Sequence, residues 1–148
     1  MINYKDDGIS HINVYSKGAT EIGRYLSNFS DCYVSTEDGV FRTVEGYWYW
    51  LACKDDRLRH TSGWESKKLG RELRVDDWPK IENFEQKISK AIVQKMTHQW
   101  CVDRLLLTSN LPFYHYYVYG SKTIMVQDGN WMLSVITEFR DQLIRGNA

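Results

Sequence analysis

The sequence predicts an α+β fold in one compact domain, residues 1–148, with short strands first and a mainly helical second half. Glycines and short β-branched or aromatic runs alternate in the first third, which is typical of strands and turns. Apolar residues recur at spacings of three and four in the second half, which is typical of amphipathic helices. A chain of 148 residues suits a single hydrophobic core.

Strands are expected first, at Ile12–Tyr15 and at Cys32–Ser35. The segment Glu37–Thr43 predicts a hairpin with Asp38-Gly39 at its tip, because this dipeptide suits the tight turn between two strands. The hairpin would lead the chain directly into a helix.

The first two helices have recognisable ends. Thr43 can cap a helix that carries Glu45 in its first turn, where the helix dipole favours a carboxylate. Ser62–Leu69 predicts a short basic helix with Gly70 as its C-cap.

The longest helical pattern starts at Asp76 or Asp77, with Pro79 in the first turn. Its apolar stripe consists of Ile81, Phe84, Ile88, Ala91 and Ile92. The stripe continues loosely to Met96 and resumes at Leu105–Leu107.

The aromatic run Tyr114–Tyr119 predicts a strand that ends at Gly120. Asn130 can cap a final helix with one apolar face. That face is formed by Met132, Ile136, Phe139 and Leu143.

Composition and charge exclude several classes of function. The chain has 19 Lys plus Arg against 19 Asp plus Glu, so no overall field draws it onto nucleic acid or an anionic membrane. The three cysteines include no C-x-x-C pair, and no histidine has a partner at metal-ligand spacing. We therefore expect no metal and no cofactor. A P-loop and a G-x-G-x-x-G fingerprint are also absent, which argues against a kinase, an NTPase or a Rossmann dehydrogenase.

No segment of the sequence approaches the roughly 20 apolar residues of a membrane span. The N-terminal stretch Met1–Asp7 carries acidic residues where a signal peptide needs a basic head. We expect a cytoplasmic protein without a membrane partner, located in the host cytoplasm if a phage encodes it.

The most informative motif sets Glu45 next to four aromatic residues, Tyr47-Trp48-Tyr49-Trp50. Aromatic faces can stack on a base or line a sugar pocket, and a desolvated carboxylate can exchange a proton, so the motif indicates nucleotide chemistry. On a helix, Trp48 shares a face with Glu45, whereas Tyr47 and Trp50 share the other face. The alternative is a capping Glu45 beside aromatics that only pack in the core.

Other polar residues support such a site. Asn28, between Ser27 and Phe29, offers a donor and an acceptor to a base edge or a ribose, although an Asn after Ser is also common in turns. A basic zone holds Arg57, Arg59, Lys67, Lys68, Arg71 and Arg74. A solvated face is the simpler interpretation of this zone, and one or two of its members could bind a diphosphate. His115 is either a structural histidine or an acid-base group.

Taken in order, the motifs resemble the NADAR superfamily of YbiA-like proteins, named for NAD and ADP-ribose. The matching pieces are Leu26-Ser27-Asn28-Phe29, Asp38-Gly39, Thr43-Val44-Glu45, Lys68-Leu69-Gly70-Arg71, Asp77-Trp78, Leu106-Leu107-Thr108, Tyr119-Gly120 and Asn130 with Glu138-Phe139-Arg140. The resemblance as a whole covers about residues 24–144.

The resemblance implies an N-glycosidase-type fold that acts on a ribose joined to a nitrogenous base. Family activities include hydrolysis of phosphorylated riboflavin-pathway intermediates and removal of ADP-ribose from guanine. Glu45 matches the family glutamate, which would stabilise the positive charge on C1′ or handle the proton. The predicted catalytic residues are Glu45, Lys54 and His115. The predicted ligand-binding residues are Ser27, Asn28, Phe29, Trp48, Tyr49, Arg71, Tyr116, Tyr119 and Gly120.

The chain departs from the family pattern at two places. Tyr49 and Ala52 stand where relatives have a Gln and a Lys, and Lys54, the nearest amine, would lie opposite Glu45 on a regular helix. Tyr116 stands where many relatives have an Asp, and a phenol needs a strongly lowered pKa to act as a base. His115 is the adjacent substitute.

Two functions follow from the resemblance. The first is an N-glycosidase that releases ribose or ADP-ribose from a base. The second is a non-catalytic binder, or sponge, for an ADP-ribose-like signal, for example in defence against phage. The implied partner is ADP-ribose, an NAD derivative or a ribosylated base, with ADP-ribosylated nucleic acid as a further candidate.

Overall fold

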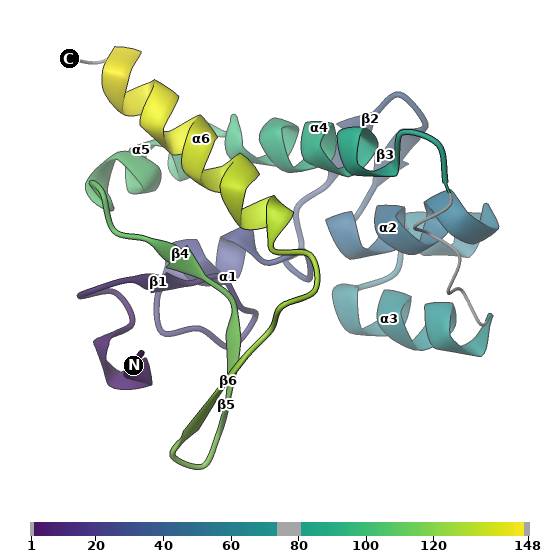
Figure 1. The fold of residues 1–148 in the computed structure, drawn as a ribbon. Helices are drawn as coiled ribbons and strands as arrows, with labels where there is room; N and C mark the ends of the chain where they lie inside the picture. The colour runs from purple at the N-terminus through teal and green to yellow at the C-terminus, as the bar shows by residue number, and fades with distance from the viewer. Residues whose placement is uncertain (1, 74–80, 147–148) are drawn as a thin grey trace. The chain divides into compact units, whose positions relative to one another are not determined.

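The computed structural model describes residues 2–73 and 81–146. The chain forms two compact units (Figure 1): Met1–Ser27 with Met96–Ala148, called the terminal unit here, and Asn28–Lys95, called the central unit. Each unit combines helices with short strands, which confirms the predicted α+β class. The single-domain organisation stays a prediction.

The terminal unit contains one 3₁₀ helix, η1, and three α-helices with four strands among its described residues. Their bounds are η1 (Tyr4–Asp6), β1 (Ile12–Asn13), α1 (Glu21–Leu26), α5 (Gln99–Leu107), β4 (Phe113–Tyr114), β5 (Tyr116–Tyr119), β6 (Lys122–Met125) and α6 (Trp131–Gly146). Strand β1 pairs in parallel with β4, and β5 with β6 forms an antiparallel hairpin (Figure 1). Helix α5 packs against α1 and α6.

The predicted strand Tyr114–Tyr119 is interrupted at His115, because the chain changes partner there from β1 to β6. The side chain of Asn13 supports the change. Its amide donates to the Tyr116 carbonyl and its oxygen accepts from the Tyr116 backbone N–H, each at 3.0 Å. This exchange satisfies buried backbone groups at the break.

Other elements of the terminal unit can also be compared with their predicted boundaries. The strand expected over Ile12–Tyr15 is limited to Ile12–Asn13. Helix α6 begins directly after Asn130, as predicted, and Ile136 is buried on its apolar face. Leu105 is a core residue of α5, a helix separate from the longer one before it.

The central unit contains the hairpin and the helices that carry the Glu45 motif. Its elements are β2 (Val34–Thr36), β3 (Gly39–Phe41), α2 (Val44–Cys53), η2 (Asp56–Arg59), α3 (Gly63–Glu72) and α4 (Phe84–Met96). The hairpin is confirmed, with Val34 opposite Phe41. Its tip is Glu37-Asp38 and not the predicted Asp38-Gly39, because Gly39 already belongs to β3 and pairs with Thr36, and its first strand starts two residues later than expected. Gly39 has φ +105°, a backbone conformation that favours glycine.

The start of α2 is confirmed, because the Thr43 hydroxyl accepts from the Gly46 N–H at 2.9 Å and Glu45 lies in the first turn. The predicted C-cap at Gly70 is wrong. Helix α3 continues to Glu72, and Gly70 instead lies against the ring of Tyr49, where an added Cβ would come within 2.3 Å. The glycine serves helix packing.

The apolar stripe of the long helix is confirmed, since Phe84, Ile88, Ala91 and Ile92 of α4 are all buried. The helix begins at Phe84, three residues after Ile81. The expected cap at Asp76 or Asp77 and the first-turn Pro79 lie outside the described residues. In the described part of the chain, no helix has the length and apolar character needed to cross a membrane.

Candidate functional site

One face of α2 is part of the central core. The rings of Tyr47 and Trp50 pack on Phe41 of β3, with centroid distances of 4.7 and 5.3 Å. The Tyr47 hydroxyl donates to Asp38 at 2.7 Å, and the Trp50 indole N–H donates to Asp56 at 2.9 Å. Each polar atom on this face has a partner, so the face stabilises the fold.

The opposite face of α2 carries Glu45. Its backbone N–H donates to the carbonyl of Asn28 at 3.0 Å, which fixes the first turn against the preceding loop. The residue keeps some solvent exposure, but its carboxyl group is desolvated. Burial raises the pKa of this carboxyl from 4.5 to about 7, and the charge of Lys67 opposes the rise. Near neutral pH the group therefore populates both its acidic and its basic form.

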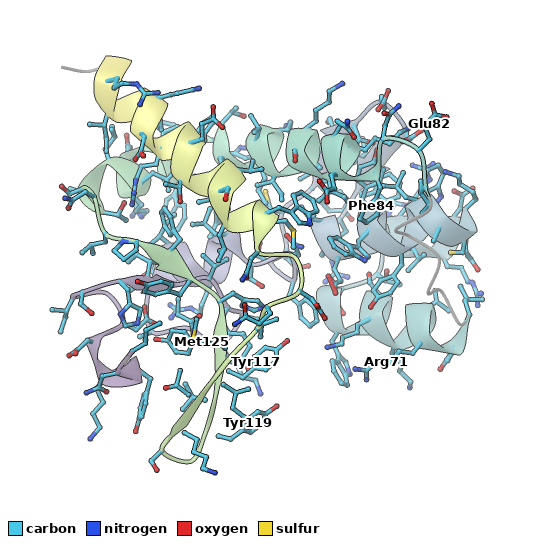
Figure 2. The ribbon with its side chains drawn as sticks, in the orientation of Figure 1. Arg71, Glu82, Phe84, Tyr117, Tyr119 and Met125 are labelled. Carbon is cyan, nitrogen blue, oxygen red and sulfur yellow. The ribbon has the colours of Figure 1, made fainter. Side chains whose placement is uncertain are left out.

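Tyr49 belongs to the same electrostatic environment. Burial raises the pKa of its phenol, the charge of Glu45 raises it further, and Arg71 opposes both. Lys67 thus acts on Glu45, and Glu45 and Arg71 act on Tyr49, and we call these four residues the Glu45 cluster. Two of them come from α2 and two from α3, whose exposed Arg71 is labelled in Figure 2.

Close packing around α2 brings these residues together. A Cβ on Gly46 would lie 2.4 Å from the Leu58 carbonyl oxygen of η2, and a Cβ on Gly63 of α3 would lie 2.5 Å from Phe29. The ammonium of Lys67 lies 5.9 Å from the centre of the Phe29 ring. Asn28 accepts the hydrogen bond from Glu45 of α2, and the next residue, Phe29, contacts Lys67 of α3. The loop before the hairpin therefore links both helices of the cluster.

Trp48 lies beside the start of α4. Its ring meets Phe84 edge-on, with a centroid distance of 4.7 Å and an interplanar angle of 86°. Phe84 is labelled in Figure 2. Both residues belong to the central unit, and Trp48 is half-buried. The predicted residues Asn28, Phe29, Trp48, Tyr49, Arg71 and Glu45 therefore all lie in this unit.

Lys54 lies at the other end of α2. It adopts a left-handed conformation, with φ 58°, and its backbone N–H caps the helix by donating to Trp50 at 2.7 Å. Its ammonium lies 4.4 Å from the centre of the Trp50 ring, on the core side of α2. Its catalytic role stays a prediction, and the cation that acts on Glu45 in this structure is Lys67.

Five predicted site residues belong to the terminal unit. They are Ser27, His115, Tyr116, Tyr119 and Gly120. Ser27 is the C-cap of α1. Gly120 lies in the turn of the β5–β6 hairpin with φ +61°, and Tyr119 beside it is 63% exposed. Tyr119 is labelled on this hairpin in Figure 2. The structure thus assigns the predicted residues to two units, and the roles of these five stay predictions.

Tyr116 is fully buried, and its hydroxyl lies 2.6 Å from Nε2 of His11. Burial raises the pKa of this phenol to about 12, the opposite of what a general base at neutral pH requires. The neighbouring ring of His115 packs against Tyr15 and Tyr117, with centroid distances of 6.2 and 5.5 Å. Aromatic side chains thus pack around both Tyr116, which stands where many relatives have an Asp, and His115, its predicted substitute.

Sequence reasoning placed Lys67 only in a general basic zone and missed its relation to Glu45. One signal was available, because Lys67 and Arg71 are four residues apart and so share a helix face. The pairing of that face with α2 depends on contacts with Phe29 and Tyr49, which no local pattern specifies.

The terminal unit contains a hollow of about 550 Å³ along α6, beside Phe113. None of the predicted site residues lines this hollow. Within residues 2–73 and 81–146, no group of three or more His, Cys, Asp or Glu side chains could hold a metal ion. The Glu45 cluster is therefore the candidate site that both the motifs and the structure single out.

Comparison with known proteins gives a structural match. The chain resembles the NMR structure of the E. coli protein YbiA with a TM-score of 0.68 and 20% sequence identity. The match covers 99% of this chain and 95% of YbiA. The chain has a YbiA-like fold. No protein-family model and no curated protein sequence matches it.

The YbiA-like fold confirms the structural part of the resemblance inferred from the motifs. A likeness at 20% identity concerns the path of the backbone, and function has to be argued from the site itself. The NADAR assignment and the activity attached to it stay predictions.

Proposed function

We propose that this protein is a cytoplasmic N-glycosidase that hydrolyses the bond between a ribose, or the ribose of ADP-ribose, and a nitrogenous base. One observation carries the proposal: Glu45, at the position that matches the family glutamate, has a desolvated carboxyl with a pKa of about 7. An acid-base catalyst works best when its pKa lies near the working pH, because it must both give and take a proton.

The proposed reaction uses water as its second substrate. Protonated Glu45 donates its proton to the base nitrogen while the C1′–N bond breaks and its electron pair stays on the base. The ionised carboxylate then stabilises the positive charge on C1′. A water molecule adds to C1′ and returns its proton to Glu45. The products are the base with a new N–H bond and the sugar with a new C1′–OH bond.

The surrounding residues support substrate binding in this proposal. Trp48 and Tyr49 offer aromatic surface next to the acid, and Asn28 and Phe29 border the same turn of α2. For the second catalytic group, Lys54 and His115 are the candidates from the motifs and Lys67 is the candidate from the structure. Single Met variants of the two lysines compare them under identical conditions.

A panel of substrates tests the proposal. Wild-type protein is incubated with ADP-ribosyl-guanosine, ADP-ribosylated single-stranded DNA, NAD and phosphorylated riboflavin-pathway intermediates, and mass spectrometry follows the release of base or ADP-ribose. We expect turnover of at least one substrate, and loss of turnover in Glu45→Gln. Glu85→Gln, which changes an exposed carboxylate of α4, is the matched control. Equal rates for wild type and Glu45→Gln would remove Glu45 from the reaction.

The same panel separates an enzyme from a binder. A ligand that binds by calorimetry and is recovered unchanged would favour the sponge, in which the Glu45 cluster holds a nucleotide without chemistry. Recovery of a free base together with a hydrolysed sugar supports the enzyme.

A further inference from the structure

Helix α3 supplies the two cations of the Glu45 cluster, Lys67 and Arg71. Lys67 and Arg71 are four residues apart and so lie one above the other on the helix. Lys67 lies over the ring of Phe29 and acts on Glu45, and Arg71 acts on Tyr49. Their shared direction is set by packing, because Gly63 and Gly70 of the same helix allow Phe29 and Tyr49 to approach closely.

Lys67 and Arg71 form no ion pair within 4.0 Å among the described residues. Other basic residues of the central unit do form ion pairs: Arg42 with Asp31, Arg57 with Asp55 and Arg59 with Asp56. Two neighbouring cations that none of the described carboxylates contacts directly form a suitable site for a phosphate or diphosphate group.

The charges that face Glu45 can be followed element by element. Lys67 of α3 is the charge that acts on Glu45, while Arg71 of α3 and Glu45 itself act on Tyr49 of α2. The charged residues of η2 are engaged in their own pairs beside Trp50, and Asp38 of the hairpin bonds Tyr47 on the opposite face of α2. Lys67 is therefore the nearby charge that favours the ionised form of Glu45.

We propose that Lys67 and Arg71 bind a phosphate or diphosphate group and that this binding drives uptake of a proton by Glu45. The bound anion offsets the positive charge of Lys67, which otherwise favours the ionised form of Glu45. Glu45 is therefore protonated to a greater extent when the anion is bound. By linkage, protonation of Glu45 strengthens anion binding to the same extent. For its use in catalysis the inference rests on the proposed glycosidase function, where binding of a phosphorylated substrate would favour the protonated form of Glu45, which then donates its proton to the leaving base.

Calorimetry tests the coupling without any turnover. Inorganic pyrophosphate is titrated into the protein near pH 7 at constant ionic strength, in two buffers with different ionisation enthalpies. Pyrophosphate itself exchanges protons near this pH, so the net proton exchange of the wild type is compared with that of Glu45→Gln. We expect both proteins to bind pyrophosphate, and the wild type to take up a fraction of a proton more than Glu45→Gln does. Equal net proton exchange in the two proteins would overturn the inference.

A second set of variants tests the site itself. Lys67→Ala and Arg71→Ala should each weaken pyrophosphate binding about tenfold or more, as expected for loss of a charge-assisted contact. Lys68→Ala makes the same charge change on an adjacent exposed residue and should retain wild-type affinity. Circular dichroism confirms that each variant is folded.

The outcomes separate this inference from the glycosidase proposal. Equal losses in all three variants, or no binding of pyrophosphate at millimolar concentration, would overturn the anion site. Turnover of an uncharged nucleoside with an intact dependence on Glu45 would at the same time uphold the glycosidase. Anion binding with proton uptake, in the absence of any turnover, would uphold the site and remove the enzyme.

Discussion

The two faces of α2 use similar residue types for different ends. On the Tyr47 face, the phenol and the indole of Trp50 donate to Asp38 and Asp56, at 2.7 and 2.9 Å. On the Glu45 face, desolvation of a carboxyl outweighs the attraction of Lys67 and holds the pKa at about 7. Both faces belong to one helix of ten residues.

The difference separates stability from function. A buried polar group with a matched partner adds to stability, whereas a carboxyl kept near neutral pKa lowers stability at pH values where it ionises. Such a cost is typical of residues that must exchange protons. The comparison yields four predictions, the first of which sets a variant of each face against the other.

The largest effect is expected on turnover. Glu45→Gln should lower kcat by roughly 10²–10⁴-fold, because the amide can neither donate nor accept the proton. Tyr47→Phe, on the opposite face, should change kcat by less than about threefold, since it removes only a structural hydrogen bond. Steady-state rates on the best substrate of the panel measure both. A large loss in Tyr47→Phe alone would reverse the assignment of the two faces.

The second effect is on the pH dependence of stability. The carboxyl pKa rises from 4.5 to about 7 on folding, so the folded state holds the proton more tightly. Below the lower value both states are protonated and there is no cost; the cost then grows as pH rises and is complete above the higher value, at up to about 3 kcal/mol. Glu45→Gln should thus become more stable relative to wild type between about pH 4 and pH 8.

Urea unfolding at the two pH values measures this difference. Glu85→Gln on α4 provides the control, because Glu85 is exposed. A stability difference between wild type and Glu45→Gln that stays constant with pH would contradict the desolvated carboxyl.

The third effect tests the packing that positions Glu45. A Cβ at Gly46 would lie 2.4 Å from the Leu58 carbonyl oxygen, a backbone atom that cannot rotate away. Gly46→Ala should therefore destabilise the protein by about 1–3 kcal/mol, although alanine is normally the better helix former. Gly146→Ala, where an added Cβ meets nothing within 4 Å, should be neutral or slightly stabilising. Thermal unfolding measures both variants. A Gly46→Ala protein as stable as Gly146→Ala, or more stable, would show that η2 does not pack closely on α2.

The smallest effect concerns the Tyr47 face. Tyr47→Phe should lower the free energy of unfolding by about 1–2 kcal/mol, because Asp38 loses a hydrogen-bond donor. Asp38 keeps the contact from Lys87 at 3.3 Å, which limits the loss. Chemical denaturation measures the change. No loss of stability would mean that solvent satisfies Asp38 equally well.

Local chemistry predicted several elements correctly. Thr43 caps α2, the Asp38-Gly39 segment belongs to a hairpin, and the stripe of α4 is buried, since each depends on residues close in sequence. The α+β class and the YbiA-like fold were also predicted. The division of α2 into a Tyr47–Trp50 side and a Glu45 side followed from helical spacing alone.

Long-range contacts decided the remainder. Gly70 was predicted to end a helix, but the ring of Tyr49 requires a glycine within it. The strand around His115 breaks because Asn13, more than a hundred residues away, bonds the backbone of Tyr116. The residues around Gly70 do not indicate Tyr49 as its partner, and those around Tyr116 do not indicate Asn13.

The sequence by itself determined which side chains α2 carries, where the helix begins and which of its two sides holds the acid, because these depend on spacing within a few turns. Only the tertiary structure decided that Glu45 is desolvated and that the charge of Lys67 acts on it. A pKa depends on the solvent and charges around the group, and that environment exists only after α2 and α3 have packed together.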